Sequence, residues 1–191
     1  MPSTTLTPQQ IIRLKAAGEP LSPDEKVQET RHTISVLVEN TVGALNRVTN
    51  MFHARGFNLE SVAVGETDDP TVSHMTLVTT GNDRIIAQVI RQLNNLIDVL
   101  RVEDVTNVEH IERELCLVKV RYNTMDRSEI MDVVNIFRGK VVDITPETMT
   151  FELTGPTKKV NAFIGLMKPH GIVSVSRSGR VVMTRHLVYG D

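Results

Sequence analysis

The 191-residue sequence is 40% hydrophobic and 23% charged, with a formal net charge of −2, which is ordinary for a globular protein of one or two domains. This charge argues against a general nucleic-acid or membrane surface, and no apolar run reaches the roughly 20 residues that span a bilayer. The N-terminus lacks the basic-then-apolar order of a secretory signal. The single cysteine, Cys116, excludes an internal disulfide and fits a reducing compartment. We therefore expect a cytoplasmic protein that binds neither nucleic acid nor membranes.

Residues 1–31 are expected to be an N-terminal extension separate from the folded modules. Two helix-start signals occur there, TPQQ from Thr7 and SPDE from Ser22, each with an N-cap residue followed by proline. The segments behind them are too short to form stable helices alone. The extension is therefore either an arm that binds a partner or a simple tail, and we favour the tail.

Residues 32–106 are expected to form a first module in which strands and helices alternate. Leu45, Val48 and Phe52 recur at helical spacing, and Gly56 is placed to end that helix. Gly81-Asn82-Asp83 is expected to open a second helix. The predicted order is strand 33–38, helix 44–55, strand 58–64, strand 72–79, helix from 83 and strand 99–105, which is βαββαβ.

Residues 107–191 are expected to form a second module that repeats the same order without repeating the sequence. Asp126 and Glu129 have the spacing of a capping box. The predicted elements are strand 115–121, helix 126–137, strand 141–144, strand 149–153, helix 157–167 and a strand from 172. The sequence thus predicts an α+β protein of two tandem ferredoxin-like modules joined near residues 107–112. Because each sheet would have helices on one face only, we expect dimerisation through the sheets.

The loop between the first strand and first helix has the features of a small-ligand site. Asn40 and Gly43 stand just before the helix, whose first N–H groups suit a carboxylate. Ala44 keeps the backbone accessible, Leu45 could supply an apolar wall, and Asn58 could reach the ligand at the same end of this module or of its dimer mate. The alternative is an ordinary strand-to-helix turn. We favour a site for a free amino acid with a short branched side chain.

Residues with catalytic or metal-binding chemistry do not form a recognisable motif. The six histidines lack metal-ligand spacing, and Cys116 alternates with valines as a buried strand residue does. Asp68 and Asp69 precede Pro70, as in a hairpin turn. The basic run 176–180, with Arg185 and His186 beyond it, is either a solvated edge or a docking surface for an acidic partner. We therefore expect no catalytic residue and no metal site, and interpret the chain as a sensor.

Several segments together resemble one family. The segments SVLVENTVGALNRV and RGFNLESVAVGETDDP resemble the N-terminal ACT domain of the small, regulatory subunits of acetohydroxyacid synthase, also called acetolactate synthase. IFRGKVVDIT, residues 136–145, and VSRSG near the end resemble the C-terminal domain of the same family. The motifs occur in the family's order from about residue 31 to the end of the chain, so the resemblance is specific.

The resemblance implies a non-catalytic subunit of an enzyme complex in branched-chain amino acid biosynthesis. Such a subunit would bind and activate a large catalytic subunit, which holds thiamine diphosphate, Mg²⁺ and FAD, and would confer feedback inhibition by valine or a related amino acid. The ligand would lie between the ACT domains of a homodimer, with Asn40, Gly43, Ala44 and Leu45 from one protomer and Asn58 from the other.

Two other kinds of function are compatible with tandem ACT modules. One is an amino-acid sensor that controls transcription or an unrelated enzyme, although the sequence has no helix-turn-helix and no basic reading helix. The other is a free-standing enzyme, for which no catalytic cluster is found. Co-purification of a large thiamine-dependent partner would separate these three possibilities.

Overall fold

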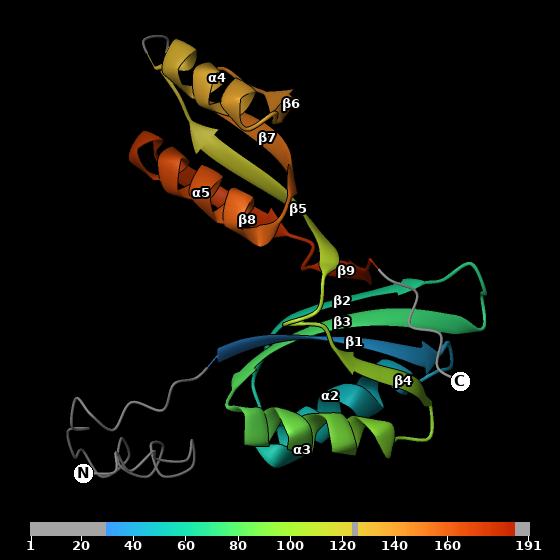
Figure 1. Cartoon of the computed structure of the whole chain (residues 1–191). Helices are drawn as coiled ribbons and strands as arrows, with labels where there is room; N and C mark the ends of the chain where they lie inside the picture. The colour runs from blue at the N-terminus through green and yellow to red at the C-terminus, as the bar shows by residue number, and fades with distance from the viewer. Residues whose placement is uncertain (1–29, 124–125, 186–191) are drawn as a thin grey trace, which may run out of the picture.

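The computed structural model describes residues 30–123 and 126–185, which form two α+β modules (Figure 1). The predicted helix starts at Thr7 and Ser22 lie outside the described residues. The first module follows the predicted βαββαβ order. Its elements are β1 (Thr30–Glu39), α2 (Ala44–Arg55), β2 (Leu59–Glu66), β3 (Val72–Gly81), α3 (Asp83–Asn94) and β4 (Val99–Asp104).

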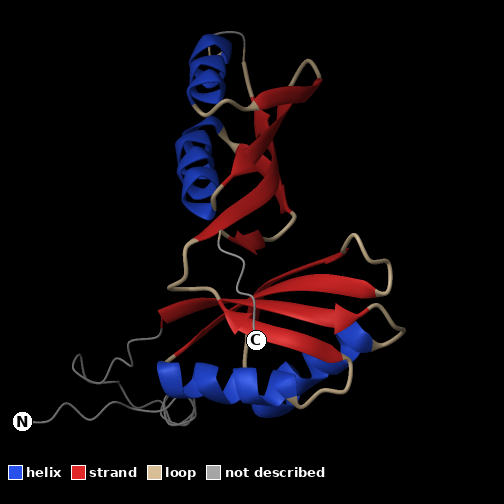
Figure 2. Ribbon diagram, turned by 45° about the vertical axis from the view of Figure 1, so that its right-hand side comes forward, coloured by secondary structure: helices blue, strands red, loops and turns tan. Residues whose placement is uncertain are grey.

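The first sheet is antiparallel throughout, with strand order β2-β3-β1-β4, and carries both helices on one face (Figure 2). Alternate residues of β1, including Ile34, Val36 and Val38, are buried and pack with Val48 and Phe52 of α2. Gly56 adopts φ 71°, a left-handed conformation that suits glycine, and ends α2 as predicted.

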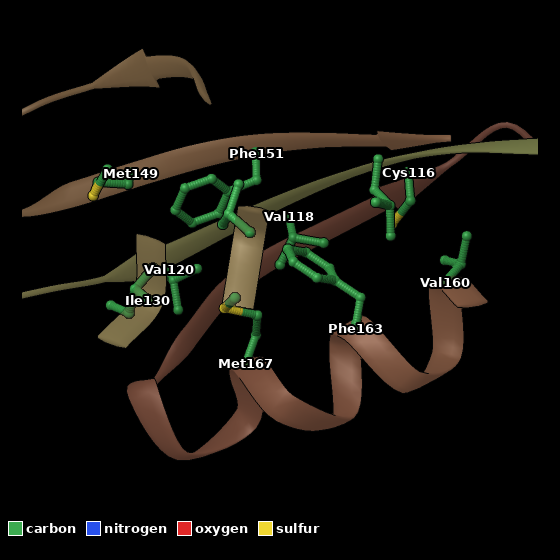
Figure 3. Close-up of a cluster of buried hydrophobic side chains, with 11 residues drawn as sticks. Cys116, Val118, Val120, Ile130, Met149, Phe151, Val160, Phe163 and Met167 are labelled. Atoms are coloured by element: carbon green, nitrogen blue, oxygen red, sulfur yellow. The ribbon is translucent and has the colours of Figure 1, made fainter. Parts of the chain in front are cut away.

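The second module repeats the arrangement with its own core. Its sheet order is β6-β7-β5-β8, and its helices again cover one face. Figure 3 shows Phe151 and Phe163 in this core beside Val118 and Met167. The elements are β5 (His110–Arg121), α4 (Arg127–Ile136), β6 (Lys140–Ile144), β7 (Thr148–Gly155), α5 (Thr157–Met167), the short 3₁₀ helix η2 (Lys168–His170) and β8 (Ile172–Arg177). The prediction of two tandem ferredoxin-like modules is confirmed.

The connection between the modules differs from the prediction. Strand β5 begins at His110, inside the segment that was expected to be a linker, because its first residues pair with an additional strand, β9 (Val181–Thr184). Strand β9 lies on the helix-free face of the first sheet (Figure 1). Thr76 and Val78 point to this face, yet they are only 2% and 1% exposed. Part of that face is thus covered by the chain itself.

The start of α4 also differs from the prediction. Asp126 is the N-cap residue, but its φ of −85° and ψ of −10° are helical, and its side chain makes no capping hydrogen bond. Instead, the main-chain N–H of Asp126 donates to the side chain of Asn123 over 3.0 Å. The predicted capping box of Asp126 and Glu129 is therefore wrong. The predicted start of α3 is confirmed, since Asn82 Oδ1 accepts a hydrogen bond from the N–H of Ile85.

Candidate functional site

The loop from Asn40 to Gly43 leads from β1 directly into α2, and Gly43 is the N-cap residue of that helix. Gly43 has φ 89°, a backbone conformation in which any side chain is strained. A Cβ there would also lie 3.0 Å from Nη1 of Arg47. Both constraints favour glycine, and its small size keeps the helix start open to a ligand.

The first turn of α2 has donors without protein partners. The N–H of Ala44 donates to Thr41 O over 3.2 Å, and that of Arg47 donates to Gly43 O over 2.9 Å. Within the described part of the chain, the N–H groups of Leu45 and Asn46 donate to no other protein group. The first turn also carries no acidic side chain. Unpaired N–H groups at the positive end of a helix form a site for a carboxylate or another small anion.

An ion pair between Arg47 and Asp98 stabilises this loop. The guanidinium of Arg47 contacts the carboxylate of Asp98 through Nε and, over 2.8 Å, through Nη2. The hydrogen bond from Arg47 lowers the pKa of Asp98. The main-chain oxygen of Asp98 also accepts a hydrogen bond from the N–H of Glu39 over 2.8 Å. Sequence reasoning missed this pair, and no motif could have shown it, because the two residues are 51 positions apart.

Asn40 already uses both N–H donors of its side chain. Nδ2 donates to the main-chain oxygen of Pro70 over 2.9 Å and to Oε1 of Glu66 over 3.1 Å. The atom that Asn40 can offer a ligand is therefore Oδ1, an acceptor suited to an ammonium group. A carboxylate at the start of α2 and an ammonium group at Asn40 would match the two ends of a free amino acid.

The apolar side of the loop is open. Val42 is fully exposed at 100%, and Leu45 is 44% exposed. Neither side chain is held by the core of its own module, whereas Ala44 is buried beneath the helix start. A single module therefore supplies the polar end of the predicted site and only part of an apolar wall.

Asn58 does not join the loop within one chain. Strands β1 and β2 both pair antiparallel to β3, so they run parallel to each other. Asn40 follows β1 where Glu39 pairs with Val72, while Asn58 precedes β2 where Leu59 pairs with Thr79. Val72 and Thr79 are seven positions apart on β3, which corresponds to about 23 Å. The option that Asn58 reaches the ligand in the same module is therefore wrong, and a shared site requires Asn58 of a second copy.

Three further titratable residues, His32, His74 and Cys116, have structural surroundings. Nδ1 of His32 lies 3.0 Å from Oδ2 of Asp104. His74 Nε2 lies 2.8 Å from Ser35 Oγ, and burial lowers the pKa of this histidine. Cys116 is a buried core residue as predicted, and burial raises the pKa of its thiol. Among the described residues, no three His, Cys, Asp or Glu side chains gather as a metal site.

The basic run ends at the junction of the modules, and the solvated-edge interpretation is wrong for Arg180, although Arg177 remains partly exposed. Arg177 pairs with the buried carboxylate of Glu114, with Nη2 2.8 Å from Oε2. The side chain of Arg180 is only 14% exposed and donates to Thr33 Oγ1 of the first module over 3.2 Å. Of the two residues beyond the run, Arg185 pairs with Glu109 over 3.5 Å, and His186 lies outside the described residues.

Models of known families match both modules. One described as the AHAS small subunit-like ACT domain matches residues 34–101, and one described as the small subunit of acetolactate synthase matches residues 113–186. In the described part of the chain, no helix is long and apolar enough to cross a membrane.

Individual proteins show the same similarity. The acetolactate synthase small subunit of Aquifex aeolicus (strain VF5) is 45% identical over 163 residues, which are 85% of each chain. The acetolactate synthase isozyme 3 small subunit of Escherichia coli (strain K12) is 43% identical over 156 residues, covering 81% of this chain and 96% of the relative. The crystal structure of the acetolactate synthase small subunit from Thermotoga maritima matches with a TM-score of 0.76 at 37% identity, covering 83% of this chain and 99% of that chain.

Proposed function

Since the chain belongs to the family of acetolactate synthase small subunits, we propose that it binds and activates the large catalytic subunit and makes that subunit sensitive to valine or a related branched-chain amino acid. In this proposal the large subunit holds thiamine diphosphate, Mg²⁺ and FAD. This chain supplies no reacting group and works as a homodimer in the cytoplasm.

The observation that carries the proposal is the open start of α2. The ligand carboxylate would accept hydrogen bonds from the N–H groups of Leu45 and Asn46, and the ammonium group would donate to Oδ1 of Asn40. Gly43 leaves the backbone accessible, and the exposed side chains of Val42 and Leu45 suit a short aliphatic group.

The second protomer completes the site in this proposal. Asn58 lies at the opposite end of the sheet from the loop of its own chain, so two copies related by a two-fold axis could each bring Asn58 to the other's α2. Two equivalent sites per dimer would result. Burial of Val42 and Leu45 at this contact would add an apolar contribution that one module lacks.

Reconstitution with the purified large subunit tests the proposal. We expect no acetolactate formation by this chain alone, a higher turnover of the large subunit when the chain is added, and a loss of that turnover when valine is added. Full activity of the isolated chain would contradict the subunit assignment. An activated complex that ignores valine, leucine and isoleucine would contradict the sensor role.

A further inference from the structure

The turn between β8 and β9, residues 178–180, contacts both modules. Its base is held on the second module, because Ser178 exchanges hydrogen bonds with Leu115: the N–H of Ser178 donates to Leu115 O, and Ser178 Oγ accepts from Leu115 N–H, each over 3.0 Å. The preceding residue, Arg177, also bonds Asn161 of α5 over 3.0 Å. The base of the turn is therefore attached to the second module.

The tip of this turn rests on the first strand residues of β2. Gly179 has φ 81°, and a Cβ at this position would lie 2.8 Å from Ser61 Oγ and 3.2 Å from the main-chain oxygen of Val62. A side chain at this position would require the Ser61 hydroxyl to rotate away and the turn or the strand to shift by a few tenths of an ångström. The contact lies where the pairing of β2 with β3 is irregular, since the register shifts between Leu59 and Ser61. It is also three residues from Asn58.

Arg180 links the same junction electrostatically. Its guanidinium donates to Thr33 on β1 and lies 3.8 Å from the carboxylate of Glu112 on β5. Glu112 in turn accepts a hydrogen bond from the N–H of Thr157 at the start of α5 over 3.0 Å. The positive charge of Arg180 also contributes to lowering the pKa values of Glu60 in the first module and Glu114 in the second. One side chain thus connects the first sheet to the helix start of the second module.

A hollow of about 380 Å³ beside the turn is lined by residues that pair with one another, including Arg31 with Glu60 over 2.5 Å and Arg177 with Glu114. Because its charged groups have protein partners, the junction is suited to holding the two modules in register. A displacement of β2 toward the turn would push on it, since the two are already in close contact at Gly179.

We propose that the turn 178–180, seated on the start of β2, is the contact through which ligand binding at the first module changes the second module. This inference rests on the proposed function, because it takes Asn58 as a ligand residue of the dimer. Binding that draws Asn58 toward the ligand shifts the irregular start of β2, and the shift moves Gly179 and Arg180 together with α5. Coupling of this kind requires an element with two conformations. Ligand binding at the first module and changes in the second module must both shift the equilibrium between these conformations.

A pair of glycine variants tests the contact. Gly179→Ala places a methyl group against β2, whereas Gly171→Ala is a matched control in the same module, with φ 80° and no atom nearer than 3.9 Å to the added Cβ. Both variants place a methyl group at nearly the same positive φ, 81° and 80°. We expect both to bind valine with a dissociation constant within about twofold of the original, as measured by calorimetry.

The two variants should differ in the complex with the large subunit. In the complex with Gly179→Ala, the valine concentration for half-inhibition should rise at least tenfold, or inhibition by valine should disappear. The complex with Gly171→Ala should be inhibited by valine as the original complex is. Hydrogen exchange on the original protein should show valine-dependent changes in residues 172–184 that are lost only in Gly179→Ala. Equal inhibition by the two variants, or valine binding without any exchange change in residues 172–184, would overturn the coupling and leave the proposed function standing. Failure of the original chain to bind valine, leucine or isoleucine would overturn the proposed sensor role, and the coupling with it.

Discussion

Gly43 carries two constraints at once, a positive φ and a close neighbour in Arg47. The first constraint belongs to the backbone, and the second to the ion pair with Asp98 that braces the loop. A larger residue would therefore both strain the turn and push the guanidinium away from its partner. At the scale of single residues, this position should be the most sensitive point of the proposed ligand site.

We predict that Gly43→Asp abolishes the stabilisation by valine. Ligand at a hundredfold excess over its dissociation constant should stabilise the native protein by about 2.7 kcal/mol, seen as a higher Tm in calorimetry. The new carboxylate would repel that of the ligand at the helix start. Gly56→Asp is the control, since Gly56 has φ 71° and a Cβ added there would have no neighbour within 4 Å. It should lose about 1 kcal/mol of stability and keep the valine response. A normal valine shift in Gly43→Asp would place the site elsewhere.

Glu114 should account for part of the loss of stability in acid. Its bond with Arg177 lowers its pKa in the folded protein. The resulting stability is present above the unfolded pKa of about 4.3 and is lost as the pH falls through the lower folded value. Glu114→Gln should reduce the free energy of unfolding at pH 7 by about 1–3 kcal/mol and flatten its decline below pH 5 in urea titrations. The exposed Glu147→Gln is the control, and an equal acid slope in both variants would contradict this assignment.

At the scale of elements, helices α3 and α4 begin in different ways although the sequence places an Asn or an Asp at the start of each. Asn82 has extended backbone angles, φ −87° and ψ 165°, which direct its side chain onto the first turn of α3. Asp126 is already helical, so its carboxylate is not directed at the first-turn N–H groups of α4. The difference lies in the backbone before each helix, which local composition does not determine.

Removing each cap residue should reveal this difference. Asn82→Ala should lower the free energy of unfolding by about 1 kcal/mol, because the N–H of Ile85 loses its acceptor. Asp126→Ala should cost only a few tenths of a kcal/mol, since only the weak attraction of its charge to the helix dipole is lost. Chemical denaturation of both variants measures the two values. Equal losses would mean that Asp126 caps α4 in solution.

At the scale of the whole molecule, two separate cores are joined by one long strand and one turn. Strand β5 pairs with β9 through its first residues and with β7 and β8 through the rest. It therefore connects β9, at the junction, with the main sheet of the second module. We expect the first module to keep its own core when the chain is cut after Asn107, because Val105 and Thr106 remain to bond Thr33. Each module should therefore fold around its own core, and communication should depend on the junction.

We predict that residues 1–107 still dimerise and bind valine, and that they activate the large subunit in part. Valine inhibition should be weaker than with the full chain, because the second module and its contact with β2 are missing. Sedimentation, calorimetry and titration of the reconstituted enzyme measure these properties. Inhibition curves that match those of the full chain would show that the second module is not needed for signalling. Loss of valine binding would show that the site lies outside the first module.

Much of the fold was determined by the sequence alone. Helix α2 and its end at Gly56, the two βαββαβ units and the burial of Cys116 follow from periodicity and from the conformational freedom of glycine, which are local properties. The open loop at Gly43 was likewise predictable, since a strand followed by glycine and an apolar helix stripe identifies a helix start. The family resemblance rested on the same residues.

Only the tertiary structure decided which distant segments meet. Strand β9 was missed because a four-residue strand exists only through its partner, here the first residues of β5. The separation of Asn40 from Asn58 follows from two parallel strands flanking β3, and the ion pair of Arg47 with Asp98 joins residues 51 positions apart. The basic run looked like a solvated edge until the junction placed Arg180 against Thr33. Strand pairing and ion pairing depend on the partner in space, whereas periodicity reports only which face of an element is apolar.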